Sequence, residues 1–409
     1  MMGGGYRRSY RQWVMNASRT GRGASSYLAA SIPVRLASSG ITVALPVLAV
    51  QQLGSIAPGG LLVAASLAPS IIVAPLAGAA LDRARRPRRL ILASALVTAA
   101  AFAVTALIGV VPVVLAAVAL IAAGCFTPFF MGGLSSVVGE IVEDERRAYA
   151  LDALSYNVAG VGGPALASLL IAVADARVAM IALAVAAAIS AVAAFAVHLT
   201  ARSRSEHPAG LAGEIGRGLA YLVRHRPLAV ITWSGTLTQL GQGALPVAAI
   251  ALALQSGADP GEGTWIVTAF SIGALVGSIA ATATSSTRFA PISVMLGGFL
   301  ATGVFTLVLA LHPGTVLTLA AAAAAGFASA PATAAMLLLR KQQSAAAVRS
   351  QVFTVGAGLR ATAGAVGAAI AGLSAGISAA LLIALVGAAW VVSAGILILY
   401  PRQAPPILD

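Results

Sequence analysis

The feature that most constrains this chain is a series of apolar segments, each about 20 residues long, which recur along almost its whole length. A helix of this length crosses the roughly 30 Å hydrocarbon core of a bilayer. The segment 178–199 is apolar on all sides, whereas the strands of a membrane β-barrel alternate apolar and polar residues. Only 9% of the 409 residues are charged, so soluble classes are excluded. The sequence predicts an all-α membrane protein.

The apolar segments predict about twelve transmembrane helices. They lie near residues 29–53, 60–81, 90–110, 113–138, 151–173, 178–199, 228–254, 264–284, 291–311, 315–339, 352–375 and 377–400. Of the 25 basic residues, all except Arg35, Arg177 and Arg360 fall on the side that holds both termini. Because basic residues accumulate in cytoplasmic loops, we expect both termini in the cytoplasm and a multi-pass protein of the inner membrane.

The same placement explains the net charge of +13 as a topology signal and an attraction to anionic membrane lipids rather than to nucleic acid. The domain boundaries that follow are a basic cytoplasmic tail, a six-helix half, a cytoplasmic linker, a second six-helix half and a short tail. These cover residues 1–28, 29–199, 200–227, 228–400 and 401–409. Within the linker, Leu211, Ile215, Leu219 and Leu222 recur at helical spacing, which predicts an amphipathic helix in the headgroup plane.

The two halves repeat each other in sequence. Residues 44–47 read Ala-Leu-Pro-Val and recur as residues 244–247, an offset of 200. At an offset of 202, Gly124 corresponds to Gly326. Alanine- and glycine-rich helices also resemble one another through composition alone, but the two offsets agree within two residues. Two parallel six-helix halves predict a central cleft between them.

A charged motif follows the second predicted span. In the segment 75–86, Gly78, Asp82, Arg83 and Arg86 resemble the loop 2–3 motif of the major facilitator superfamily, G-x-L-A-D-R-x-G-R-[KR]. The segment departs from the motif at residue 85, where arginine replaces the second glycine. The resemblance implies that Asp82, Arg83 and Arg86 act in gating, with Asp82 meeting the start of the eleventh helix. The alternative is a basic loop that only follows the positive-inside rule.

A second motif lies in the fifth predicted span. Segment 159–168 resembles the superfamily's antiporter motif, G-x-x-x-G-P-x-x-G-G, with Gly163 and Pro164 retained. These two residues are a further pair of gating candidates, and tight helix packing is the alternative. With segments 147–157 and 218–227, the chain resembles the bacterial exporter branch that includes enterobactin-type siderophore and drug efflux carriers.

Two arginines lie inside predicted spans of opposite halves. Arg35 and Arg360 are each about 10–12 Å from the expected cytoplasmic end. Asp152 is the nearest candidate counter-ion by depth, and one carboxylate cannot neutralise two guanidinium groups. We expect Arg35 and Arg360 to bind an anionic group of the substrate, and snorkelling to the headgroups is the alternative. Proton coupling through Asp82, Asp152 or the substrate, or no coupling at all, stays open.

Neutral hydrogen-bonding residues complete the predicted substrate site. Thr42, Asn157, Gln239 and Gln242 lie inside predicted spans and either line the cleft or join helices. No metal-ligand spacing, phosphate-binding loop or nucleophile and base pair is found, so we expect no metal, no cofactor and no enzyme activity.

The function predicted from the sequence is a monomeric secondary transporter that exports a drug-like, siderophore-like or natural-product molecule by alternating access. The alternatives are a passive facilitator or importer of the same fold and a membrane sensor that does not transport.

Overall fold

The computed structural model describes residues 4–84, 86–142, 145–196, 220–221, 223–283, 290–312, 314–344, 346–374 and 376–401. The helices are α1 (Gly4–Leu53), α2 (Ala57–Leu67), α3 (Pro69–Arg83), α4 (Pro87–Ala106), α5 (Val113–Ile141), α6 (Glu145–Val173), α7 (Ala176–Ala196), α9 (Arg226–Gln255), α10 (Pro260–Ala283), α11 (Pro291–Ala310), α12 (Thr315–Gln342), α13 (Ala346–Leu373) and α14 (Ala379–Leu397). Twelve segments in the described part of the chain are long and apolar enough to span a membrane. The predicted fold class is confirmed.

Two helical boundaries differ from those expected. The second predicted span consists of two helices, because α2 ends at Leu67 and α3 begins at Pro69. Proline has no backbone N–H, so it fits the first turn of a helix and cannot donate to the turn before it. The first helix is longer than expected, since α1 begins at Gly4 within the predicted tail, whereas its membrane-spanning part is Gly23–Leu53. Of the amphipathic helix predicted at 211–222, the structure describes residues 220–221, which are helical, and the rest lies outside the described residues.

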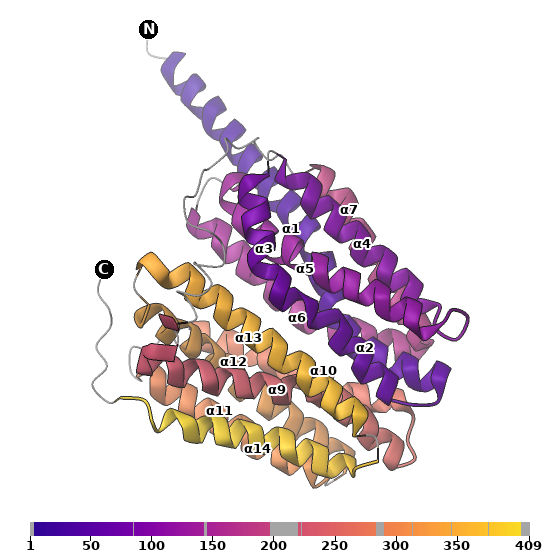
Figure 1. Cartoon of the computed structure of the whole chain (residues 1–409). Coiled ribbons are helices and arrows are strands. Elements are labelled where there is room, and N and C mark those ends of the chain that lie inside the picture. Colours follow the sequence, from indigo (N-terminus) through magenta and orange to yellow (C-terminus); the bar gives the residue numbers. More distant parts are fainter. Residues whose placement is uncertain are drawn as a thin grey trace.

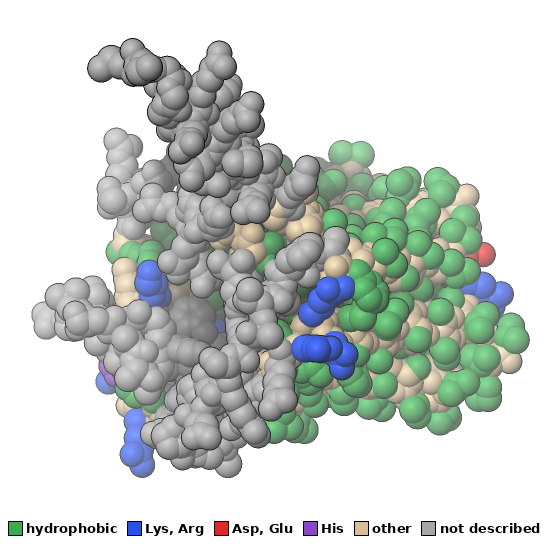
Figure 2. Space-filling view, turned by 90° about the horizontal axis from the view of Figure 1, so that it is seen from above, with side chains coloured by type: hydrophobic (Ala, Val, Ile, Leu, Met, Phe, Trp, Pro, Cys, Tyr) green, Lys and Arg blue, Asp and Glu red, His purple; other side chains and the backbone are tan. Residues whose placement is uncertain are grey.

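The helices form two bundles, α1–α7 and α9–α14, which we call the N-terminal and C-terminal halves (Figure 1). Figure 1 also shows that α1 begins and α14 ends at the same end of the molecule, which we call the terminal end. The opposite end, which carries the α1–α2 and α9–α10 connections, is the far end. Hydrophobic side chains cover most of the visible flank (Figure 2), as expected of a surface that faces lipid.

Helix contacts show that the two halves repeat the same packing. A Cβ atom built on Gly124 of α5 would lie 2.6 Å from the carbonyl oxygen of Ser66 at the end of α2. A Cβ atom built on Gly326 of α12 would likewise meet the carbonyl oxygen of Phe270 in α10. Glycine at both positions allows the close helix approach that association in lipid requires.

A pair of glutamines gives a second structural correspondence, at the far end. The Oε1 atom of Gln51 accepts a hydrogen bond from the backbone N–H of Ala176, at the start of α7, at 3.0 Å. The Oε1 atom of Gln255 accepts the equivalent bond from Ala379, at the start of α14, at 2.7 Å. In each half the end of the first helix therefore caps the start of the last, as two parallel repeats predict.

Candidate functional site

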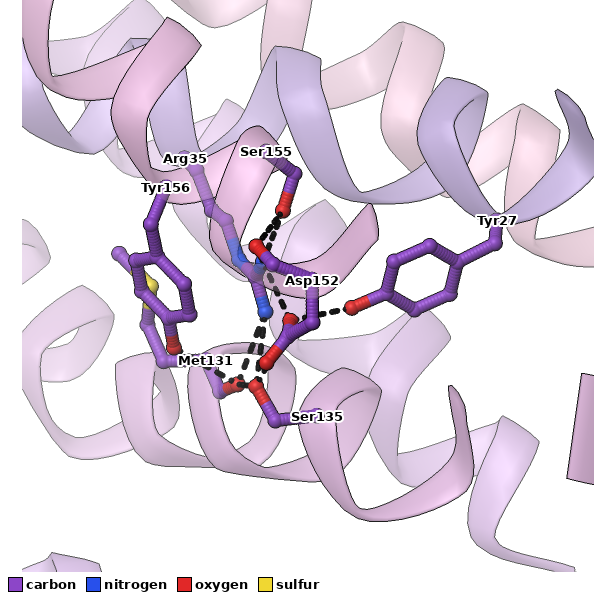
Figure 3. A network of polar contacts seen from close by, with 7 residues as sticks. All are labelled: Tyr27, Arg35, Met131, Ser135, Asp152, Ser155 and Tyr156. Atoms are coloured by element: carbon purple, nitrogen blue, oxygen red, sulfur yellow. Dashed lines mark hydrogen bonds and ion pairs between the residues drawn. The ribbon is translucent and has the colours of Figure 1, made fainter. Parts of the chain in front are cut away.

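The main polar cluster of the N-terminal half is built around Arg35 (Figure 3). Arg35 projects from α1, its side chain is 1% exposed, and its Nη1 atom lies 2.8 Å from the Oδ1 atom of Asp152 in α6. The same Nη1 donates to the hydroxyl of Ser155, and Nη2 donates to the hydroxyl of Ser135 in α5 at 3.0 Å. Side chains from three helices thus surround the ion pair of Arg35 and Asp152.

Two tyrosines complete this cluster. The hydroxyl of Tyr27, two helical turns before Arg35 in α1, donates to the same Oδ1 atom of Asp152. The ring of Tyr156 lies 3.7 Å from the guanidinium carbon of Arg35, and its hydroxyl donates to the carbonyl oxygen of Met131 at 3.2 Å. A buried guanidinium that has a carboxylate, hydroxyls and an aromatic face around it avoids the penalty of an unpaired charge.

This geometry revises the expected role of Arg35. The sequence left open which arginine Asp152 would neutralise, and the structure pairs Asp152 with Arg35. The guanidinium is held inside its own half and does not extend to the headgroups. Because the fork of Arg35 is already occupied, a substrate anion has to displace Asp152 before it can bind there. Binding of substrate by Arg35 stays a prediction, with this additional requirement.

In the C-terminal half, two arginines approach each other instead of an arginine and an acid. Arg360 lies on α13 and is half-buried, in the opposite half from Arg35 as predicted. Arg340, in the last turn of α12, is 1% exposed. Arg340 was not predicted from the sequence, because this residue directly follows a predicted span and precedes Lys341, a pattern typical of an interfacial basic anchor.

The neutral candidates lie on α1 and α9. Thr42 is half-buried, and its hydroxyl donates to the carbonyl oxygen of Ser39 in its own helix at 2.8 Å. Gln239 and Gln242 are half-buried on α9. A Cβ atom built on Gly364 would lie 3.7 Å from the carbonyl oxygen of Gln239, which places Gln239 beside α13 one turn beyond Arg360. The side chain of Asn157 lies outside the described residues.

The gating candidates divide into two groups. A Cβ atom built on Gly163 would lie 2.5 Å from the carbonyl oxygen of Leu36, so Gly163 permits a close crossing of α6 over α1. Pro164 lies inside α6, which continues from Glu145 to Val173. Arg86 is exposed between α3 and α4. The side chains of Asp82 and Arg83 lie outside the described residues, so their predicted gating role stays a prediction.

The two halves touch most closely at the far end, and α13 packs along α3 as well as α2. A Cβ atom built on Gly60 of α2 would lie 2.7 Å from the Cα atom of Gly372 in α13. The hydroxyl of Ser168, near the end of α6, accepts a hydrogen bond from Thr268 of α10 at 2.9 Å and donates to the carbonyl oxygen of Thr264 at 3.3 Å. Within the described part of the chain, these are the hydrogen bonds that join the halves.

A separate groove of about 620 Å³ lies between α11 and α12. Apolar residues such as Val294, Phe305 and Phe327 line it, with Ser293 as the polar exception. Neither Arg340 nor Arg360 contributes to this lining. The groove therefore lacks the convergent polar groups that a site for a polar substrate needs.

Comparison with protein families and solved structures defines the fold further. The family model described as Major Facilitator Superfamily matches residues 27–238, slightly more than half of the chain. A structure of the nucleoside transporter NupG aligns with a TM-score of 0.74 at 13% identity and covers 93% of this chain and 100% of its own. A POT family transporter in complex with a thioalcohol-conjugated peptide aligns with a TM-score of 0.72 at 11% identity, covering 93% and 96%.

A POT family transporter in complex with 5-aminolevulinic acid has a TM-score of 0.70 at 11% identity and covers 93% of this chain and 96% of its own. Because these sequence identities are low, the similarity to the three structures shows a shared fold. Comparison with curated protein sequences gave no match.

Proposed function

Because this chain belongs to the major facilitator superfamily, we propose that it moves a small molecule across the cytoplasmic membrane by alternating access, in the export direction. The superfamily and the transporter structures that share its fold make the protein a secondary transporter rather than an enzyme. We also propose that the cargo is a drug-like, siderophore-like or natural-product molecule and that the protein lies in the inner membrane.

Alternating access is supported by the location of the contacts between the two halves. Two repeated halves meet at the far end through Gly60 and Gly372, and through Ser168 and Thr268. The buried arginines of both halves lie toward the terminal end, away from these contacts. Two rigid bundles that are joined at one end can rock about a site between them, which is how transporters built from repeats alternate access. In this reading the conformation is closed at the far end.

The proposed substrate site contains groups from both halves. Arg35, Thr42 and Asn157 would contribute from the N-terminal half, and Gln239, Gln242 and Arg360 from the C-terminal half. Asp82, Arg83 and Arg86, together with Gly163 and Pro164, would act in gating. Export is supported by the resemblance of segment 159–168 to the antiporter motif.

Orientation is tested first. Both termini and the segment 200–227 should face the cytoplasm, because nearly all basic residues fall on that side. A reporter fused after Pro227 should report a cytoplasmic location. A reporter signal from outside the membrane would reverse the orientation and, with it, the side to which this conformation opens.

Transport is then tested in oriented vesicles. Candidate compounds are first screened for thermal stabilisation of the purified protein, because a ligand that binds only the folded state raises its apparent stability. Flux of each stabilising compound is measured in inside-out and right-side-out vesicles, with and without a proton gradient. Uptake driven by the gradient into inside-out vesicles supports an exporter. Uptake that only equalises the concentration indicates a facilitator, and the absence of flux for every bound compound indicates a sensor.

A further inference from the structure

Arg340 and Arg360 leave several buried N–H groups without a partner. The Nε and Nη2 atoms of Arg340 and the Nε atom of Arg360 are buried, and no described residue offers them a hydrogen bond. A buried guanidinium without compensating interactions is costly. Arg35 in the other half avoids most of this cost, since both of its Nη atoms have acceptors.

The two side chains share one location between three helices. The guanidinium of Arg340 extends from α12 to α13, where a Cβ atom built on Gly356 would lie 2.9 Å from Nη1 and 3.1 Å from Cζ. Its Nη2 atom lies 3.7 Å from a Cβ atom built on Gly235 of α9. Arg360 follows Gly356 by one helical turn, a rise of about 6 Å. Residues four apart lie on the same face of a helix, so Arg360 is on the face of α13 that the guanidinium of Arg340 contacts at Gly356.

Gly235 leaves space in α9 for side chains of α12. At the offset of 200 between the halves, Gly235 corresponds to Arg35. The C-terminal half therefore has no side chain where the N-terminal half has its arginine; the sulfur of Met336 from α12 fills that space, and Nη2 of Arg340 lies next to it, 3.7 Å from a Cβ atom built on Gly235. Both halves thus place a guanidinium near equivalent positions, but among the described residues a carboxylate accompanies it in the N-terminal half alone.

The C-terminal half contains no acid at this depth. Between residues 228 and 400 the sequence has two carboxylates, Asp259 and Glu262, and both lie where α9 connects to α10 at the far end. Arg340 lies in the last turn of α12, at the terminal end of a 28-residue helix that spans about 42 Å. Neither carboxylate can reach it. In the other half, Asp152 is already paired with Arg35, and the side chain of Asp82, which the motif resemblance places near the start of α13, lies outside the described residues.

We propose that Arg340 and Arg360 form an anion site that binds the carboxylate or phosphate group of a ligand. Guanidinium groups donate in a planar fork that matches such oxygens, and two of them can hold one anion from two sides. Arg340 supplies a buried, pre-positioned group, and the half-buried Arg360 gives access to it. The ligand is either a transported solute or a lipid headgroup. The solute source rests on the proposed transport function, whereas the anion site itself does not.

Inorganic phosphate tests the site in the full-length purified protein. In a neutral detergent at constant ionic strength, phosphate should raise the melting temperature in a saturable way by about 2–4 °C. Arg340→Gln and Arg360→Gln should each lose this increment. The increment is read within each variant, so a change in its basal stability does not affect the comparison.

A matched pair of glycine variants tests the geometry without removing a charge. In Gly356→Ala the added methyl would crowd Nη1 of Arg340, the end of a flexible side chain, which can move without unfolding the helix. Gly356→Ala should weaken phosphate binding several-fold. Gly364→Ala adds the same methyl two turns further along α13, in ordinary contact distance, and should bind phosphate like the wild type.

The two possible sources of the anion are separated in nanodiscs. If the ligand is a solute, phosphate stabilises the protein equally in phosphatidylcholine and in phosphatidylglycerol nanodiscs. If it is a lipid headgroup, phosphatidylglycerol raises the melting temperature through Arg340 and Arg360 and removes the effect of phosphate. The anion site is overturned if neither phosphate nor phosphatidylglycerol stabilises the wild type, or if Arg340→Gln and Arg360→Gln keep the full increment. Flux of a stabilising compound in the wild type reports on transport separately.

Discussion

Arg35 and Asp152 form an ion pair inside the N-terminal half, with 2.8 Å between Nη1 and Oδ1, and Tyr27 donates to the same carboxylate oxygen. The pair joins α1 to α6 at a depth where neither side chain is freely solvated. The two halves differ in this respect, because no described carboxylate forms an ion pair with Arg340 or Arg360 of the C-terminal half.

Removing the acid should destabilise the protein more than removing the whole pair. Asp152→Asn leaves Arg35 buried and charged, so we expect a loss of about 3–5 kcal/mol. The double variant Arg35→Gln with Asp152→Asn should lose less, because no charge remains unpaired. Melting temperatures in detergent measure both. Equal losses would show that the pair contributes through packing alone.

Close helix approach at Gly124 predicts a second stability difference. Gly124→Ala introduces a methyl 2.6 Å from the backbone oxygen of Ser66 and should cost about 1–3 kcal/mol through overpacking. Gly132→Ala is the control in the same helix, because a Cβ atom there meets nothing within 4 Å. Gly132→Ala should leave the melting temperature unchanged or slightly raised, since alanine favours helix. If both variants melt alike, α5 and α2 do not pack as described.

The contact between the halves at Gly60 should set the balance between open and closed states. In Gly60→Ala the added methyl lies 2.6 Å from the carbonyl oxygen of Ala368, so closure at the far end becomes strained. We expect distances between spin labels across the far end to lengthen in this variant. Gly376→Ala, in open space at the same end, is the control. An unchanged distance distribution in Gly60→Ala would remove this contact from the gate.

The charged motif at the end of α3 gives a prediction about the rate of transport. If Asp82 latches the halves, Asp82→Asn should insert normally and slow the flux of a compound that the vesicle assay identifies as cargo, because the neutral amide interacts more weakly with a helix amino terminus. Arg89→Gln, an exposed change at the start of α4 outside the predicted gating residues, is the control and should keep wild-type flux. Wild-type flux in Asp82→Asn would assign the motif to topology alone.

The recurrence of apolar segments was sufficient to predict the twelve spans, because the bilayer fixes how long an apolar segment must be. The division between α2 and α3 could not be predicted as easily, since Pro69 is compatible with a kinked span as well as with two helices. The partners of Arg35 were predictable by depth but not by direction, which depends on how α1 rotates against α6. Arg340 was missed for the same reason, because a basic residue at a helix end can extend outward or fold back into the bundle.

The most direct test of alternating access uses a cysteine in the proposed cleft. In a Cys125→Ser background, which removes the single native cysteine, Gln239→Cys is treated with a membrane-impermeant thiol reagent from either side of the membrane. Thiolates react in water and not in lipid, so labelling reports access of water to the cleft. We expect labelling from both sides of the membrane, with faster labelling from the side of the terminal end. A ligand that closes the far end should suppress labelling from the far side. Labelling from one side only, under every ligand condition, would contradict it.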